Sequence, residues 1–185
     1  MDTSETTKPA RSKQTILIVD DAPMNRALLA DMLGDEYEII EASDGTEAVS
    51  VLQARSESIA LVLLDIVMPD MDGLEVLAMM NNHGWITTTP VIMVSSETSS
   101  AVIDKAYSLG ATDFISRPFD TAIVRRRVLN TLMLYGKQRE LANMVEEQIL
   151  ARDQSVSLMV SILSQIVEFR NGESGLHVLH VNTIT

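Results

Sequence analysis

The chain has 185 residues, a hydrophobic content of 46%, a formal net charge of -12 and no cysteine. This size suits one ordinary domain with an appendage, and the acidic balance argues against binding to nucleic acid or to an anionic membrane. Without thiols, disulfides and thiolate metal sites are excluded. No apolar run is as long as a membrane helix, and the first residues do not resemble a signal peptide, so we expect a cytoplasmic protein.

The order of elements along the chain predicts the fold. Residues 1–13 mix Thr, Ser, Lys and Pro without apolar periodicity, which is typical of a disordered tail. Five apolar runs then alternate with helical patterns, which favours an α/β fold: a flavodoxin-like, doubly wound parallel sheet with strand order 2-1-3-4-5. The strands are predicted at Thr15–Val19, Tyr37–Ala42, Ala60–Leu64, Val91–Val94 and Asp113–Ser116.

Helical patterns fill the gaps between these strands. The first helix begins with Asp-Ala-Pro at residues 21–23, and the second follows the turn Ser43-Asp44-Gly45. The third follows Gly73, and the fourth runs from about Ser99 to Leu109.

A much longer helical pattern begins at about Thr121 and runs to about Arg170, with an interruption only at Gly136. Spacings of three and four place apolar residues on one stripe, broken by Arg152. The stripe consists of Ala142, Val145, Ile149, Val156, Met159, Leu163 and Ile166. We predict a linker helix at residues 137–170 that forms a coiled coil in a homodimer; the alternative is a helix that packs on its own domain.

Three carboxylates follow the predicted first and third strands, which are neighbours in the sheet. Asp20 and Asp21 come after Val19, and Asp65 ends an unbroken apolar run before the turn that contains Pro69. Ligands bind at the carboxyl edge of such sheets, and clustered carboxylates with water select Mg2+. Taken singly, Asp20 or Asp21 is also interpretable as the cap of a turn.

Four motifs, each at the end of a strand, carry a family resemblance. They are Ile18-Val19-Asp20-Asp21 with Asn25-Arg26, Leu64-Asp65-Ile66-Val67-Met68-Pro69-Asp70-Met71-Asp72-Gly73, Val94-Ser95-Ser96, and Arg117-Pro118-Phe119. With them, residues 14–136 resemble the receiver domain of two-component response regulators. The resemblance implies that Asp65 accepts a phosphoryl group from a histidine kinase or phosphotransfer protein. It also implies that Asp21, Asp65 and the Val67 backbone carbonyl bind Mg2+, with Asp20 acting through a metal-bound water.

The same resemblance assigns three further residues. Ser95 matches the hydroxyl residue that binds a phosphoryl oxygen, and Phe114 matches the aromatic residue that repacks when that hydroxyl moves. The alternatives are simple strand termination for Ser95 and simple core packing for Phe114. Arg117 stands where the family usually carries Lys, and its larger planar guanidinium still pairs with phosphoryl oxygens. The family also implies a cis bond before Pro118.

The last stretch, residues 168–180, resembles the opening of HD-type phosphohydrolase domains, notably the HD-GYP branch of cyclic-di-GMP phosphodiesterases. The early Glu and His of those domains bind metal, and Glu173 and His177 lie four residues apart in an expected second helix. We expect residues 171–185 to be the start of a truncated output domain, because a His-Asp dyad is absent from the sequence. Ordinary polar helix residues are the other interpretation of this pair.

These observations predict a phosphorylation-controlled module that signals through a dimerising helix to an output domain. Apart from its own phosphotransfer and dephosphorylation, we do not expect this chain to be an enzyme. One alternative is a constitutive dimerisation or adaptor protein with a degenerate receiver. A phosphatase with an Asp nucleophile is less well supported, because Val67 occupies the place of the second Asp of its Asp-x-Asp motif.

Overall fold

The computed structural model describes residues 13–96 and 99–181, with side chains described as far as residue 166. The chain divides into two units, Met1–Lys137 and Gln138–Thr185. Apart from Lys13, the predicted disordered tail lies outside the described residues.

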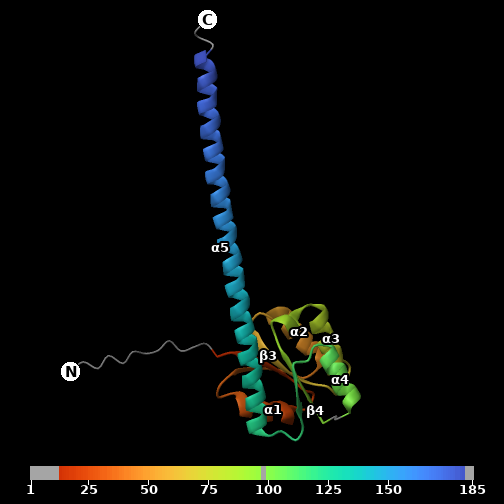
Figure 1. Ribbon diagram of the computed structural model, residues 1–185. Coiled ribbons are helices and arrows are strands. Elements are labelled where there is room, and N and C mark those ends of the chain that lie inside the picture. The colour runs from red at the N-terminus through yellow and green to blue at the C-terminus, as the bar shows by residue number, and fades with distance from the viewer. Residues whose placement is uncertain (1–12, 97–98, 182–185) are drawn as a thin grey trace, which may run out of the picture. The chain divides into compact units, whose positions relative to one another are not determined.

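The first unit is built on a five-stranded parallel sheet, which confirms the predicted fold class (Figure 1). Its strand order is β2-β1-β3-β4-β5, as predicted. The strands are β1 (Thr15–Val19), β2 (Glu38–Ala42), β3 (Ile59–Asp65), β4 (Val91–Ser95) and β5 (Asp113–Ser116). β3 is one residue longer at each end than predicted, because Ile59 pairs with Thr15 and Asp65 pairs with Val94. β2 is an edge strand, and its Glu38 and Glu41 are exposed.

Several helices of this unit begin at residues whose side chains cap them. The helices are α1 (Pro23–Leu33), α2 (Gly45–Arg55), α3 (Gly73–Asn82), the 3-10 helix η1 (Trp85–Thr87), α4 (Ser100–Ser108) and the start of α5 (Thr121–Val181). Pro23 occupies a first-turn position of α1, where its missing N–H has no helical partner to lose. Asp44 and Ser99 cap α2 and α4, and Asp72 with Glu75 forms a capping box on α3.

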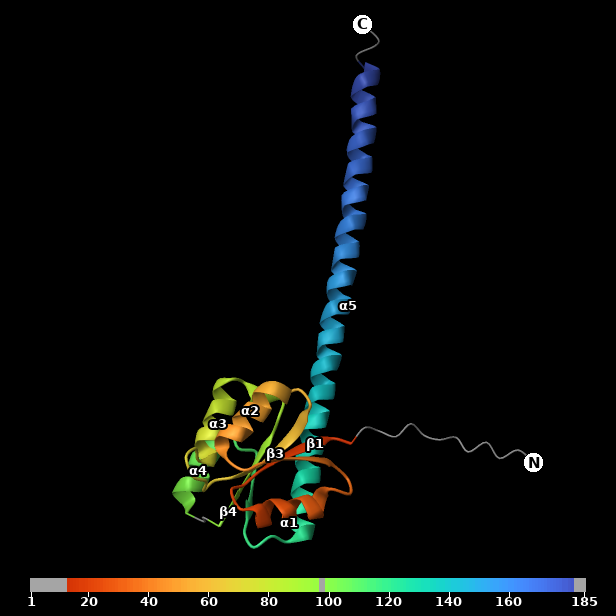
Figure 2. The same cartoon turned by 180° about the vertical axis from the view of Figure 1, so that it is seen from behind.

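Helices cover both faces of the sheet, so the strands are buried on both sides (Figure 2). On one face, α1 and the first turns of α5 pack against Ile16, Ile18 and their neighbours. On the other face, α2, α3 and α4 pack against Leu17 and Val19. This explains the unbroken apolar runs of the strands, since in a two-sided core successive side chains both face helices.

The helix α5 is a single element from Thr121 to Val181. The expected interruption at Gly136 and the expected second helix in residues 171–185 are therefore wrong. A glycine inside a helix costs only about 1 kcal/mol relative to alanine, too little to end a helix that its neighbours favour. Among the described residues, no helix is both long and apolar enough to cross a membrane.

Candidate functional site

The carboxyl edge of the sheet brings Asp20, Asp21 and Asp65 together. One oxygen of each carboxylate lies within 4.8 Å of the others. Asp20 and Asp65 are each 1% exposed, whereas Asp21 is exposed. The grouping follows from topology, since β1 and β3 are parallel neighbours and therefore end side by side.

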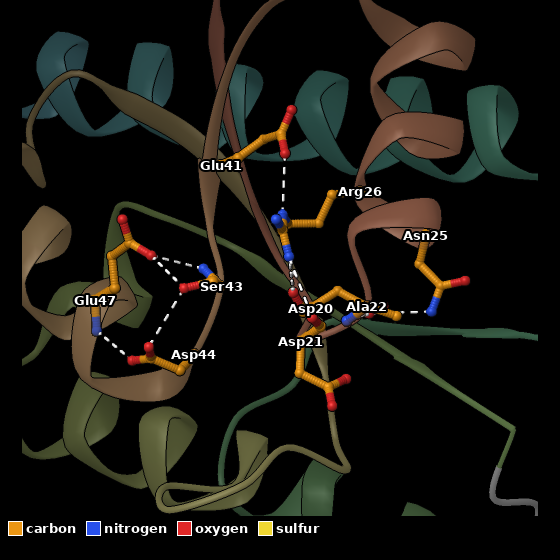
Figure 3. A network of polar contacts seen from close by, with 9 residues as sticks. All are labelled: Asp20, Asp21, Ala22, Asn25, Arg26, Glu41, Ser43, Asp44 and Glu47. Carbon is orange, nitrogen blue, oxygen red and sulfur yellow. Dashed lines mark hydrogen bonds and ion pairs between the residues drawn. The ribbon is translucent and has the colours of Figure 1, made fainter.

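The Asp20 carboxylate is held by donors from two directions. Its Oδ1 accepts hydrogen bonds from the Ala22 backbone N–H at 2.9 Å and from the Asn25 side chain at 3.0 Å, both in the first turn after β1 (Figure 3). Its Oδ2 accepts a hydrogen bond from Nη2 of Arg117, at the end of β5. These hydrogen bonds fix the orientation of the carboxylate.

The Asp65 carboxylate has fewer hydrogen-bond donors around it than the Asp20 carboxylate in the described residues. Its Oδ2 lies 3.2 Å from Nη2 of Arg117, while its Oδ1 is buried and has no hydrogen-bond partner among the described residues. Burial raises the pKa of the Asp65 carboxyl, and the nearby Arg117 charge opposes that rise. A buried carboxylate oxygen with free lone pairs, beside two further carboxylates, fits a hard divalent cation such as Mg2+.

The turn after β3 depends on Gly73. A Cβ at this position would lie 1.9 Å from the carbonyl oxygen of Asp65, so only glycine allows this approach. The Gly73 N–H donates to the carbonyl of Ile66 at 2.9 Å, and Asp70 adopts a left-handed conformation with φ 63°. The turn leaves Val67 62% exposed, two residues after the phosphoacceptor candidate.

Arg117 follows the edge strand β5, and its side chain reaches the carboxylates from there. Its backbone N–H donates to the carbonyl of Ser95 at 3.0 Å, and its bond to Pro118 is cis, as the resemblance implies. The guanidinium carbon lies 5.8 Å from the centre of the Phe119 ring, and the side chain is 23% exposed. Its Nε is buried without a hydrogen-bond partner in the part of the chain that the structure describes.

Ser95 and Phe114, the two predicted switch residues, lie in the neighbouring strands β4 and β5. Ser95 is fully buried at the end of β4, one residue beyond Val94, which pairs with Asp65. Phe114 in β5 pairs with Met93 and packs against the core between the sheet and α2, α3 and α4. Their roles in a switch remain predictions.

Arg26 is a site residue to which the sequence assigned no role. Its Nη1 donates to the backbone carbonyls of Asp20 at 2.8 Å and Asp21 at 3.4 Å, and its Nε donates to Glu41 of β2 at 3.0 Å (Figure 3). The available signal is its position one turn into α1, from which a long side chain reaches back to the preceding loop.

The candidate pair at the C-terminal end lies in the second unit of the chain. Glu173 and His177 belong to the backbone of α5, and their side chains lie outside the described residues.

Comparison with known proteins gives a family match over the first unit and several similar proteins. The family described as response regulator receiver domain matches residues 16–129. A Vibrio cholerae protein named "Probable cyclic di-GMP phosphodiesterase" is 33% identical over 175 residues, which cover 91% of this chain and 39% of that protein. The transcriptional regulatory protein SrrA of Staphylococcus aureus is 38% identical over 114 residues, which cover 61% of this chain and 45% of SrrA. The chain thus spans less than half the length of either relative.

Solved structures show the same fold. The chemotaxis protein CheY4 of Vibrio cholerae has a TM-score of 0.61 and 26% identity, covering 65% of this chain and 99% of that one. A CheY-like receiver domain protein from Methanospirillum hungatei JF-1 has a TM-score of 0.63 and 26% identity, with coverages of 69% and 99%.

Proposed function

Because this chain belongs to the response regulator receiver domain family, we propose that it accepts a phosphoryl group on Asp65 from a histidine kinase or phosphotransfer protein. Receiver domains interact with such donors. The observation that carries the proposal is the buried Oδ1 of Asp65, which has no partner among the described residues and lies beside two further carboxylates. An oxygen in this position is available as a nucleophile.

The reaction is a phosphoryl transfer between two side chains. An Asp65 oxygen attacks the phosphorus of a phosphohistidine, the P–N bond breaks, and the imidazole leaves with the electron pair. The product is an aspartyl phosphate. Arg117, 3.2 Å from the other oxygen of Asp65, offsets part of the negative charge that gathers there.

Magnesium fits the donor set of this site. Asp21, Asp65 and the Val67 backbone carbonyl would hold it, with Asp20 acting through a water molecule. When bound, the ion acts as a Lewis acid that neutralises the phosphoryl oxygens. Hydrogen bonds from Ala22 and Asn25 already hold the Asp20 carboxylate in position at the site.

Two residues carry the signal away from Asp65 in this proposal. The Ser95 hydroxyl binds a phosphoryl oxygen after transfer, and Phe114 repacks into the space that this movement opens. The support is positional: Ser95 follows the residue that pairs with Asp65, and Phe114 is only partly buried in the neighbouring strand. A buried hydroxyl movement thereby becomes a change at β5 and α4.

Acetyl phosphate with Mg2+ tests the acceptor assignment. Intact mass spectrometry should show one phosphoryl group on the wild-type chain and none on Asp65→Asn, which keeps the shape of the side chain but is a poor nucleophile. Asp21→Asn retains Asp65 and should be phosphorylated much more slowly. Stoichiometric phosphorylation of Asp65→Asn would contradict the proposal.

We also propose that α5 joins two copies of the chain. In this organisation residues 14–136 form the receiver and residues 137–170 a coiled-coil linker. The six large apolar residues of the stripe are 52–63% exposed in the described chain: Val145, Ile149, Val156, Met159, Leu163 and Ile166. Pairing two such stripes removes this apolar surface from water.

For the full-length protein we propose an HD-type cyclic-di-GMP phosphodiesterase as the output domain, beginning at about residue 171, with Glu173 and His177 as metal ligands. The support is the Vibrio cholerae relative, whose similarity covers 91% of this chain and so extends beyond the receiver match. The test is hydrolysis of cyclic di-GMP by the product of the complete reading frame. A frame that encodes a DNA-binding domain in its place would contradict this part of the proposal.

The second candidate function is a constitutive dimerisation or adaptor protein. It is favoured by Arg117 in place of the usual Lys and by the exposed stripe on α5. Beryllofluoride with Mg2+ separates the two, because a signalling receiver should change its oligomeric mass or its Mg2+ affinity, whereas an adaptor should change neither.

A further inference from the structure

Arg152 interrupts the apolar stripe of α5. The stripe advances by alternating steps of three and four residues, which are the a and d positions of a seven-residue repeat. Its a positions are Ala142, Ile149, Val156 and Leu163, and its d positions are Val145, Arg152, Met159 and Ile166. A single positive charge therefore occupies a d position, with apolar residues before and after it on the stripe.

No acidic side chain of the same helix is placed to compensate Arg152. Residues three and four positions apart are neighbours on a helix surface, and here they are Gln148, Ile149, Ser155 and Val156. Asp153 is adjacent in sequence, but consecutive residues do not face each other on a helix. Arg152 forms no ion pair with any other described residue. If two stripes pair, this charge leaves water without a partner from its own chain, which costs free energy.

We infer that Arg152 pairs with Asp153 of a second copy of the chain, and that this pairing fixes the two α5 helices parallel and in register. The inference rests on the proposed function, because it takes the stripe as the contact between two copies. In a parallel pair, a d side chain inserts between residues of the facing helix that include the position after d, called e. Asp153 is that e residue. The contact occurs twice in the dimer, so two positive and two negative charges alternate across one level of the interface.

Other alignments of the two stripes leave more of the interface disrupted. In the parallel register both Arg152 side chains lie at one level, and every other level of the stripe stays apolar. If one helix is turned end for end, each d position faces an a position, so each Arg152 faces an apolar residue and two levels are disrupted. If parallel helices slide by one repeat, one Arg152 faces Val145 and the other faces Met159, and two levels are again disrupted.

An exchange of the two charges tests the pairing in the full chain. Arg152→Glu places a negative charge beside Asp153 of the other copy, and Asp153→Arg places a positive charge beside Arg152. Each variant alone should self-associate at least about tenfold more weakly than wild type, since two attractive contacts per dimer become repulsive. An equimolar mixture restores opposite charges in both contacts, and should associate about as tightly as wild type in analytical ultracentrifugation.

Glu147→Arg is the matched control for Asp153→Arg. It makes the same change of charge at an exposed position of α5 that lies outside the stripe, and its self-association should stay within about twofold of wild type. All of these positions follow the last buried residue of the two cores, so the receiver unit of every variant should still be phosphorylated by acetyl phosphate at the wild-type rate.

An introduced cysteine reports the orientation of the helices, because the chain has no cysteine of its own. In a parallel pair in register, the two copies of Ile166→Cys lie at one level of the interface and should form a disulfide in a glutathione buffer. Ser164→Cys, two residues away and outside the stripe, should form far less disulfide. A low yield from Ile166→Cys, or equal yields from both variants, would overturn the parallel register.

Two further outcomes separate the inference from the proposed function. A mixture of Arg152→Glu and Asp153→Arg that associates no more tightly than either variant alone would overturn the inference and leave the proposed dimer in place. A wild-type chain that stays monomeric at every concentration measured would overturn the proposed dimer, and the inference with it.

Discussion

Arg26 shows how a residue outside the carboxylate cluster supports it. Its guanidinium contacts two other segments of the chain: the carbonyls of Asp20 and Asp21 in the loop after β1, and Glu41 of the edge strand β2. The loop that carries Asp20 and Asp21 is thus anchored to the edge strand β2. Contacts of this kind hold the loop with Asp20 and Asp21 in place, although Arg26 does not touch the Asp65 carboxylate in the described contacts.

Arg26→Ala should loosen this loop. We expect a loss of about 1 kcal/mol in the free energy of unfolding, since the Arg26–Glu41 pair is partly exposed, together with slower phosphorylation of Asp65 by acetyl phosphate. Urea unfolding and the rate of mass gain measure the two effects. In the control Glu41→Gln the carbonyl contacts remain, so its phosphorylation rate should stay close to wild type; equal rates in all three proteins would contradict a positioning role.

Two glycines in different surroundings give a matched pair. Gly73→Ala places a Cβ 1.9 Å from the carbonyl oxygen of Asp65, and should reduce the free energy of unfolding by about 1–3 kcal/mol or more as the turn shifts. Gly136→Ala adds a methyl group in open space within α5, and should instead increase stability by about 0.5–1 kcal/mol. Thermal unfolding of both variants checks the signs; a neutral Gly73→Ala would show that the turn tolerates the displacement.

The motifs made part of the site predictable. Asp20, Asp21 and Asp65 each follow a buried apolar strand, and parallel topology brings strand ends together, so their grouping follows from sequence order. The bridge from Arg117 to Asp20 joins residues 97 positions apart and depends on rotamers, which no local pattern specifies. The Arg26 contacts escaped prediction for the same reason.

The apolar stripe of α5 provides a test at the level of one element. Ile149 lies on the stripe and is 56% exposed, while Leu150 lies beside it and is 57% exposed. If two stripes pair, Ile149→Asp should weaken self-association roughly a hundredfold, because two apolar side chains per dimer are replaced by charges. Leu150→Asp should have little effect. Analytical ultracentrifugation of both variants decides, and equal weakening would mean that the stripe is not the interface.

Element boundaries were predictable where composition changes sharply. All five strands begin and end within one residue of their predicted positions, because each is an apolar run between turn residues. The continuity of α5 was not predicted, since Gly136 was expected to interrupt the helix although the cost of glycine in a helix is small relative to that of proline. Long helices follow the sum of their residues rather than one weak position.

At the scale of the whole molecule, the two units should unfold separately. Every buried residue of the two cores precedes residue 133, so Met1–Lys137 should fold by itself. We expect this fragment to melt at the temperature of the receiver transition in the full chain. The additional helical signal of the full chain should melt at a temperature that rises with protein concentration, as for an associating helix. Circular dichroism at several concentrations measures both, and a fragment that does not fold would contradict this division.

The exposed edge strand β2 has a consequence for aggregation. An unpaired strand edge is a template on which a second sheet can add by backbone hydrogen bonds. Here the edge carries the exposed Glu38 and also Glu41, which is paired with Arg26, so a second copy that approached strand to strand would bring acidic side chains together. The acidic side chains thereby protect the sheet against extension into fibre-like assemblies.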